Sequence, residues 1–296
     1  MSRAASTVLA PAAHAEILDG ARAAAGRAAD RAGIRIAMPH KLEELGRAAA
    51  VWQRVWSPDG EPLVPGEMLR ALTHAGNYLG AAYAGDELVG ALMGFFGAGA
   101  HADRLHSHIL GVDPHAVGHG VGHALKLHQR AWTLERGIER ITWTYDPLVR
   151  RNGHFNLVKL GARGVEYLVD FYGPMPDAIN GGEPTDRVLV DWDLTLPGIG
   201  VAATAVEDVE AWRVRGAMVA LDTDASGAPR PGDGFAADCE LLLCATPPDI
   251  VALRRADPAC AREWRAALRT VMLDALQRGL QLVAMARGGW YVLARD

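Results

Sequence analysis

The chain has 296 residues, half of them hydrophobic and 22% charged, and its formal net charge at pH 7 is −5. These values suit a globular protein with one large domain or two modest ones. The negative balance argues against a general nucleic-acid or membrane-surface binder, and no apolar run approaches the roughly 20 residues of a membrane span. Three cysteines, all in the last quarter of the chain, do not make a disulfide framework. We therefore expect a cytoplasmic protein with reduced cysteines.

Up to about residue 195 the chain carries short patterns of both helix and strand type. An Ala-rich stretch over 12–32 predicts a helical extension with little packing of its own. Beyond it, apolar residues at steps of three and four indicate helices, and alternating apolar runs indicate strands. The expected order is strand 34–38, helices 42–56 and 65–74, strands 78–83, 87–96 and 105–112, helix 121–136, strand 138–145, helix 149–160, and strands 165–172 and 188–194. This order predicts an α/β fold with a mixed sheet.

The composition changes after this point. Residues 195–235 are rich in Gly, Pro and Asp, with one candidate helix over 206–213, and the last 60 or so residues are again well patterned. We therefore expect three parts, which are a helical extension over 1–32, an α/β domain over 33–195, and a smaller C-terminal α/β region over 196–296.

The C-terminal region repeats a local order seen earlier in the chain. The unit strand, Asp113-Pro114, helix, Gly137, strand resembles the later unit strand, Pro247-Pro248, helix, Gly279, strand. The second unit has no glycine-rich turn before its helix. Two interpretations remain open: a degenerate half-repeat, or a coincidence among the few connections that α/β folds use.

A glycine-rich turn lies between the strand 105–112 and the helix 121–136, with glycines at 118, 120 and 122. Glycine lets the backbone approach a ligand closely and adopt positive φ, and free N–H groups at a helix start bind anions. The turn therefore predicts a diphosphate site, and the alternative is a helix start that needs small residues for packing. A dinucleotide motif would need glycine where His123 stands, and no Walker lysine–serine pair follows.

This turn resembles the signature of the GCN5-related N-acetyltransferase (GNAT) superfamily, Arg/Gln-x-x-Gly-x-Gly/Ala. Gly120 and Gly122 match its glycines, whereas Val117 stands where Arg or Gln is usual. The resemblance covers 34–195, and the run from Leu105 to Gly161 resembles a two-part branch. Some relatives in that branch are associated with N-acylation of amino acids, including succinyl transfer. The resemblance implies a mixed, mostly antiparallel sheet flanked by helices, acetyl-CoA or another acyl-CoA as co-substrate, and direct attack of an amine on the thioester.

The resemblance also implies where the co-substrate lies. The strand backbone over 109–112 would pair with the pantetheine arm as an added strand does, and the turn over 118–122 would hold the pyrophosphate. The N–H of Leu110 would face the developing oxyanion. Asn152 would touch the cofactor arm or cap its helix. The residues expected to bind the cofactor are Ile109, Leu110, Gly111, Val112, Val117, Gly118, His119, Gly120, Val121, Gly122, His123 and Asn152.

The superfamily's usual acid is a tyrosine four residues before the glycine that closes its fourth helix. Leu157 stands at that position. The transfer still needs a group to protonate the leaving thiolate, or the thiolate leaves unaided. The candidates are Tyr145, at the end of the neighbouring strand, and His154, on the helix, and Tyr167 and Tyr172 are weaker ones.

For the base that accepts the amine proton, the candidates are His108 on the strand before the turn and Asp146 acting through a water. Each has an ordinary structural interpretation, because a strand histidine is often a packed residue and Asp146-Pro147 is a common turn.

Seven of the eleven histidines lie between 101 and 128, which raises the question of a metal site. His119 and His123 are four residues apart, but the glutamate of a His-Glu-x-x-His motif is replaced by Gly120. We therefore expect no metal. The histidines near the turn, with Lys126 and Arg130, are expected to face the phosphates of the co-substrate.

Three functions follow from these patterns. The first is an N-acyltransferase of the acetyl-CoA or succinyl-CoA type that acts on a small amine, such as an amino acid. The alternative is a catalytically weak CoA-binding or regulatory protein, which Leu157 and Val117 favour. A third is a metal-dependent hydrolase built on the histidines. The expected partners are an acyl-CoA and a small amine, with no nucleic acid or membrane, and a homodimer is an option for the assembly.

Overall fold

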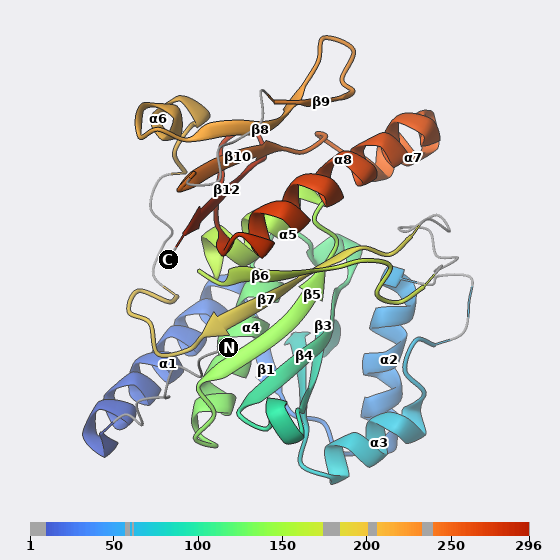
Figure 1. Cartoon of the computed structure of the whole chain (residues 1–296). Coiled ribbons are helices and arrows are strands. Elements are labelled where there is room, and N and C mark those ends of the chain that lie inside the picture. The colour runs from blue at the N-terminus through green and yellow to red at the C-terminus, as the bar shows by residue number, and fades with distance from the viewer. Residues whose placement is uncertain are drawn as a thin grey trace.

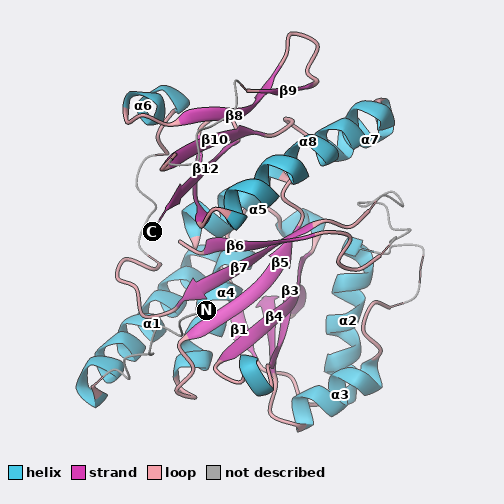
Figure 2. Cartoon of the chain, viewed as in Figure 1, coloured by secondary structure: helices cyan, strands magenta, loops and turns pink. Residues whose placement is uncertain are grey.

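The computed structural model describes residues 10–56, 60, 62–173, 184–200, 206–232 and 239–295. Within these residues the chain builds a 12-stranded sheet with helices on both faces (Figures 1 and 2). In spatial order the strands are β1 (Arg35–Ala37), β2 (Tyr78–Ala84), β3 (Glu87–Phe96), β4 (Arg104–Val112), β5 (Arg140–Tyr145), β7 (Arg187–Asp193), β6 (Arg163–Leu168), β11 (Leu280–Ala286), β12 (Trp290–Arg295), β10 (Leu241–Ala245), β8 (Met218–Thr223) and β9 (Pro229–Pro231). The expected mixed, mostly antiparallel α/β sheet is confirmed.

The first seven strands of this order are antiparallel to their neighbours at every pairing except β4 with β5. The parallel pairing of β4 and β5 covers three residues of each strand and ends at His106 and Thr142. β4 then continues to Val112 and β5 to Tyr145 without pairing to each other. The register between β3 and β4 also shifts by one residue between Met93 and Gly94, which marks a bulge at His108. The sheet is therefore open between β4 and β5.

Two layers of helix cover the two faces of these strands. α4 (Val121–Leu134) and α1 (Pro11–Ala32) pack on one face, and α2 (Leu42–Trp56) and α3 (Gly66–His74) on the other. Alternation along the strands separates the two cores, because Tyr78 contributes to the first and Leu79 to the second.

The expectation that the Ala-rich extension has little packing is wrong. One side of α1 is buried, and its alanines pack against α4 because small side chains let two helices approach closely. His14 Nε2 lies 3.0 Å from Leu134 O, and the Arg22 guanidinium pairs with Glu135 at 2.7 Å. The buried residues are Ala21, Ala24, Ala25 and Ala28.

The C-terminal region contains α6 (Val209–Val214), α7 (Ile250–Ala256) and α8 (Pro258–Gln277) besides its strands. Of these strands β8 and β9 were not expected from the sequence. They belong to the stretch rich in Gly, Pro and Asp, whose composition hid their alternation.

The strand pairings of the C-terminal region repeat those of the first half. β8 with β10 is parallel, and β10 with β12 and β12 with β11 are antiparallel. The same senses relate β4 to β5, β5 to β7, and β7 to β6. This pattern makes β10 the counterpart of β5, so the sequence comparison that aligned it with β4 is shifted by one strand. The described part of the connection from β8 to β10 contains β9 and no counterpart of α4.

The two halves join where β6 meets β11 in antiparallel pairing at Gly164 and Leu282. A Cβ added at Gly164 would lie 2.8 Å from the Leu282 Cβ atom, so only glycine allows this approach. Because β6 and β11 are counterparts, their antiparallel pairing relates the two halves by an approximate two-fold axis.

Buried arginine–carboxylate pairs also hold the halves together. Arg265 on α8 donates two hydrogen bonds of 2.8 Å to the Asp146 carboxylate, and Arg254 on α7 donates a third of 2.9 Å. Arg269 on α8 donates two bonds of 2.8 Å to Asp186, the residue before β7. Figure 1 shows α8 crossing the molecule between the halves. Burial alone would raise the pKa of the Asp146 carboxyl, but Arg265 and Arg254 outweigh burial and hold that pKa well below its usual range.

We expect Arg265→Met to lower the free energy of unfolding by about 3 kcal/mol, because it removes one partner from a buried ion pair. Chemical denaturation at pH 7 measures this loss, and Met in place of the exposed Arg255 serves as the control. The pair adds stability above the ordinary carboxyl pKa of about 3.9, and that stability is lost as the pH falls through the lower folded-state pKa. If Arg265→Met cost as much free energy of unfolding below the folded-state pKa of Asp146 as it does at pH 7, the ion-pair assignment would be contradicted.

Candidate functional site

The glycine turn is open at the start of α4. Gly118 and Gly120 adopt φ angles of 92° and 86°, and Gly120 is the N-cap residue with no side chain bonding to the helix. The first amide that bonds back is that of Ala124, which donates to Gly120 O at 3.0 Å. The amides over 121–123 precede it and are the free N–H groups of a helix start. Residues 117–120 are exposed, so the turn offers donors to an anion.

Conformation rather than packing explains the glycines of the turn. A Cβ added at Gly118 would meet nothing within 4 Å, and one at Gly120 would lie 3.8 Å from the Ala32 Cβ atom. Both positions have positive φ, which other residues rarely adopt. The alternative that the turn needs small residues for close packing is therefore not supported at these two positions.

The backbone of β4 faces the opening with free amides. Asp113 N donates to Val89 O at 2.9 Å, and the register from Ile109 to Val112 is continuous. Because amides of an antiparallel strand alternate in direction, those of Leu110 and Val112 point away from β3. They face the side on which β4 pairs with β5 only as far as His106, and no other described strand pairs there. Gly111 has a packing reason, since an added Cβ would lie 2.7 Å from Trp52.

Three basic residues from three elements lie near the turn. They are His123 on α4, Arg31 at the end of α1, and Lys159 at the end of η3 (His154–Lys159), a π-helical turn. Burial, followed by the charges of Lys159 and Arg31, lowers the pKa of His123, so its imidazole is neutral at pH 7 and the two charges beside it are those of Lys159 and Arg31. Sequence reasoning missed Arg31 and Lys159, because neither lies near the turn in the chain.

The other cations expected at the phosphates lie elsewhere. His115 is 2.7 Å from Asp113 and 3.4 Å from Glu87, so it serves the loop before the turn. Arg130 is buried and donates to Leu194 O at 2.9 and 2.7 Å. The Lys126 amine is buried under the sheet. The expectation that Lys126 and Arg130 face the phosphates is therefore corrected.

His108 lies at the bulge of β4 on the face that α2 covers. Its ring is 5.7 Å from Phe95 and 6.2 Å from His106, and it remains open to solvent. Burial lowers its pKa, so the imidazole is neutral and able to accept a proton at neutral pH. Its neighbour His106 was not singled out as a catalytic candidate. Burial, with the charges of His108 and Lys126, lowers the pKa of His106 to about 4.

The other three catalytic candidates are not brought together with His108. Asp146 bonds two arginines and the Leu148 amide, so its carboxylate has a structural role. Tyr145 is buried on the α4 face and interacts with Tyr291, and burial raises its pKa. His154 begins η3, where burial and then the charge of Lys159 lower its pKa.

Asn152 is not the N-cap that its sequence position suggested. It lies inside α5 (Arg150–Gly153), whose N-cap residue is Val149, and its amide donates to Val149 O at 2.9 Å. Asn156 is the buried asparagine of this segment, and it accepts a 3.2 Å hydrogen bond from Trp143 Nε1.

Residues 44–155 match the model of the acetyltransferase (GNAT) family. This part of the chain is a GNAT domain. The matched residues of this GNAT domain run from α2 to η3 and include β4, the glycine turn and β5.

Solved structures similar to the chain include three N-acetyltransferases. The ribosomal-protein-S18-alanine N-acetyltransferase from Escherichia coli is 14% identical, covers 56% of this chain and 96% of its own, and has a TM-score of 0.45. An N-acetyltransferase from Staphylococcus aureus Mu50 is 13% identical, with 54% of this chain and 98% of its own covered and a TM-score of 0.44. The ribosomal-protein-alanine N-acetyltransferase from Brucella melitensis is 16% identical, with 54% of this chain and 99% of its own covered and a TM-score of 0.44. No curated protein matches the chain.

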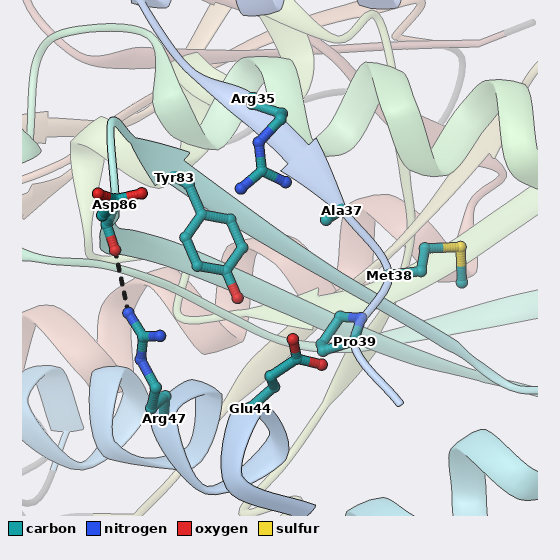
Figure 3. A pocket seen from close by; sticks show the side chains of 8 residues that line it. All are labelled: Arg35, Ala37, Met38, Pro39, Glu44, Arg47, Tyr83 and Asp86. Atoms are coloured by element: carbon teal, nitrogen blue, oxygen red, sulfur yellow. Dashed lines mark hydrogen bonds between the residues drawn. The ribbon is translucent and has the colours of Figure 1, made fainter. Parts of the chain in front are cut away.

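Two cavities lie outside the β4–β5 opening. The larger, of about 410 Å³, is at the β1 edge of the sheet, and Figure 3 shows the Arg35 and Arg47 side chains beside the Tyr83 ring. Their guanidinium carbons are 4.8 and 5.7 Å from the ring centroid. The smaller, of about 180 Å³, lies between β5, β7 and β6. Neither is lined by residues of the GNAT turn.

Neither a metal cluster nor a membrane-spanning helix is present in the described residues. No group of three His, Cys, Asp or Glu side chains there is placed to hold a metal ion. None of the helices in the described part of the chain is long and apolar enough to cross a membrane.

We expect Gly120→Val to abolish the thermal stabilisation that CoA gives, because a β-branched residue cannot hold φ near 86° and the amides of the turn would move. Saturating CoA, at about 100 times its Kd, should raise the stability of the wild type by about 2.7 kcal/mol. Gly137→Val, at φ 71° with nothing within 4 Å, carries a similar backbone strain away from the turn. It should keep the CoA response. Equal responses in the two variants would argue against the turn as the CoA site.

Proposed function

We propose that the chain is a cytoplasmic, acyl-CoA-dependent N-acyltransferase that moves an acetyl or similar acyl group to a small amine, such as an amino acid. The observation that carries the proposal is the uncapped amide turn of α4 beside a strand edge that has no partner. In the GNAT family a glycine turn at a helix start and a neighbouring strand with free amides bind acyl-CoA. The turn before α4 and the end of β4 suit that co-substrate in this chain.

The co-substrate would be held mainly by backbone. The amides over 121–123 would bind the pyrophosphate, with the positive end of α4 and the charges of Arg31 and Lys159 supporting them. The amides of Leu110 and Val112 would bind the pantetheine arm and the thioester oxygen. Val117 is 60% exposed, so the arginine or glutamine that is usual at this position would extend into solvent rather than into the core.

The acceptor amine would approach from the face that carries His108. There a neutral imidazole at the bulge would take the proton that the attacking nitrogen loses. Polar groups lie next to His106, the neighbour of His108, and further along β5: Thr142 is 3.4 Å from the His106 ring, and Thr144 is 3.1 Å from the Tyr172 hydroxyl. These groups suit a small polar acceptor.

The second candidate is a GNAT protein that binds CoA but transfers acyl groups poorly. Leu157 in place of the usual tyrosine favours it, because a buried leucine has no proton to give. Thermal shift with acetyl-CoA, succinyl-CoA and CoA tests binding. Thiol release with a panel of amino acids and other amines then tests transfer. Stabilisation without thiol release would support the second candidate, and no stabilisation by any of the three compounds would contradict both.

We expect His108→Gln to lower kcat/KM by about 10²–10⁴-fold and leave CoA stabilisation unchanged, because general-base catalysis contributes a factor of this size. The acid limb of the wild-type pH profile should lie below the ordinary histidine pKa of 6.5, since burial lowers the pKa of His108 and the base must be neutral. The limb should disappear in the variant. His101→Gln, at an exposed histidine, is the control. A variant with wild-type kcat/KM would remove His108 from the mechanism.

A further inference from the structure

The buried amine of Lys126 lies where β4 and β5 part. Lys126 is 3% exposed and projects from α4 toward the sheet. Its Nζ atom donates to Ser107 Oγ at 2.8 Å and lies 3.6 Å from the centroid of the Trp143 ring. Ser107 and Trp143 are the first residues after the last β4–β5 pair, His106 with Thr142. The amine therefore occupies the apex of the opening on the α4 side.

No carboxylate among the described residues pairs with this amine. The groups around it are a hydroxyl and an indole face, with His106 on β4 as the titratable neighbour that feels its charge. Gln129, one turn further along α4, is fully buried and its two amide atoms have no hydrogen-bond partner. Burying an ammonium without a counter-charge costs several kcal/mol, and burial lowers the pKa of Lys126 well below its usual range. A position this costly for stability suggests a role in chemistry.

The amine also lies beside the segment that lacks the usual proton donor. The Trp143 ring that faces Lys126 donates its Nε1–H to Asn156 on η3, and Leu157 is the next residue. Lys126, on α4, therefore lies on the same side of the β4–β5 opening as Leu157 on η3, the position that holds the usual tyrosine of the family.

We propose that Lys126 is the catalytic acid that protonates the departing thiolate, an inference that rests on the proposed acyl transfer. The amine nitrogen of the acceptor forms a bond to the thioester carbonyl carbon and gives its proton to His108. The carbon–sulfur bond breaks and its electron pair passes to sulfur. The Lys126 ammonium holds the bound thiolate as an ion pair and donates a proton to the sulfur as CoA leaves the site, so Lys126 becomes a neutral amine. Proton exchange with water restores both side chains, so an acyl thioester and an amine give an amide and free CoA.

The first test uses CoA binding and does not depend on turnover. A thiol bound beside Lys126 should give its proton to the amine, so the wild type should hold CoA largely as thiolate, which absorbs in the ultraviolet. We expect Lys126→Met to reduce the thiolate fraction of bound CoA by about tenfold or more, equivalent to one pKa unit. Gln129→Met is the matched control on the same side of α4 and should leave the thiolate fraction unchanged.

The second test uses the reaction. With acyl-CoA and an accepted amine, Lys126→Met should lower kcat by about 10²–10⁴-fold. It should also remove the fall in rate at high pH that deprotonation of the acid causes in the wild type. Lys126→Gln, which can still bond to Ser107 but carries no charge, should behave as Lys126→Met does and covers the case in which methionine does not fold.

The outcomes separate this inference from the function beneath it. Equal thiolate fractions in the wild type and both Lys126 variants, with CoA bound to each, would overturn the role of Lys126 and leave the acyl transfer standing. A wild type that does not bind CoA would overturn both. Loss of folding in both variants, with Gln129→Met folded, would mark Lys126 as structural and would also count against the proposal.

Discussion

The functional part of this protein depends on the early end of one strand pairing. β4 and β5 are parallel neighbours for three residues and then separate. That separation leaves the β4 amides of Leu110 and Val112 without a bond to β5, and the Lys126 side chain reaches from α4 to the point where the two strands part. A parallel pair that continued to Val112 would have consumed the same amides in the sheet. The opening is therefore made by missing hydrogen bonds between two strands as much as by the residues that line it.

Such an opening needs support from outside, because a strand without a partner on one edge is held less firmly. β5 is supported on its other side by β7, and the residue after β5, Asp146, is held by arginines from α7 and α8. Asp186, just before β7, is held by Arg269 in the same way. The C-terminal half thus holds the wall of the opening in place through two carboxylates that belong to the first half.

The sequence predicted the order of elements in the first half and the turn at Gly118–Gly122, because glycine, proline and hydrophobic period act locally. It did not reveal the contribution of Arg31 and Lys159, since three elements distant in sequence meet there only after folding. Asp146 looked like a turn residue and a candidate base, and nothing local announces that two arginines more than a hundred residues away occupy its oxygens. The role of Asn152 as an N-cap was misjudged because the helix begins at Arg150, three residues earlier than that assignment required.

The approximate two-fold relation between the halves bears on how many donor molecules one chain can hold. In the C-terminal half the counterparts of β4 and β5 are β8 and β10. They also pair at three positions, from Leu242–Met218 to Cys244–Leu221, but then run on only to Thr223 and Ala245. No helix with a glycine start follows β8 in the described part of their connection. The described residues therefore contain one strand opening with an amide turn beside it, in the first half. Under the proposed function this predicts one acyl-CoA site among the described residues, with the second half supporting the first.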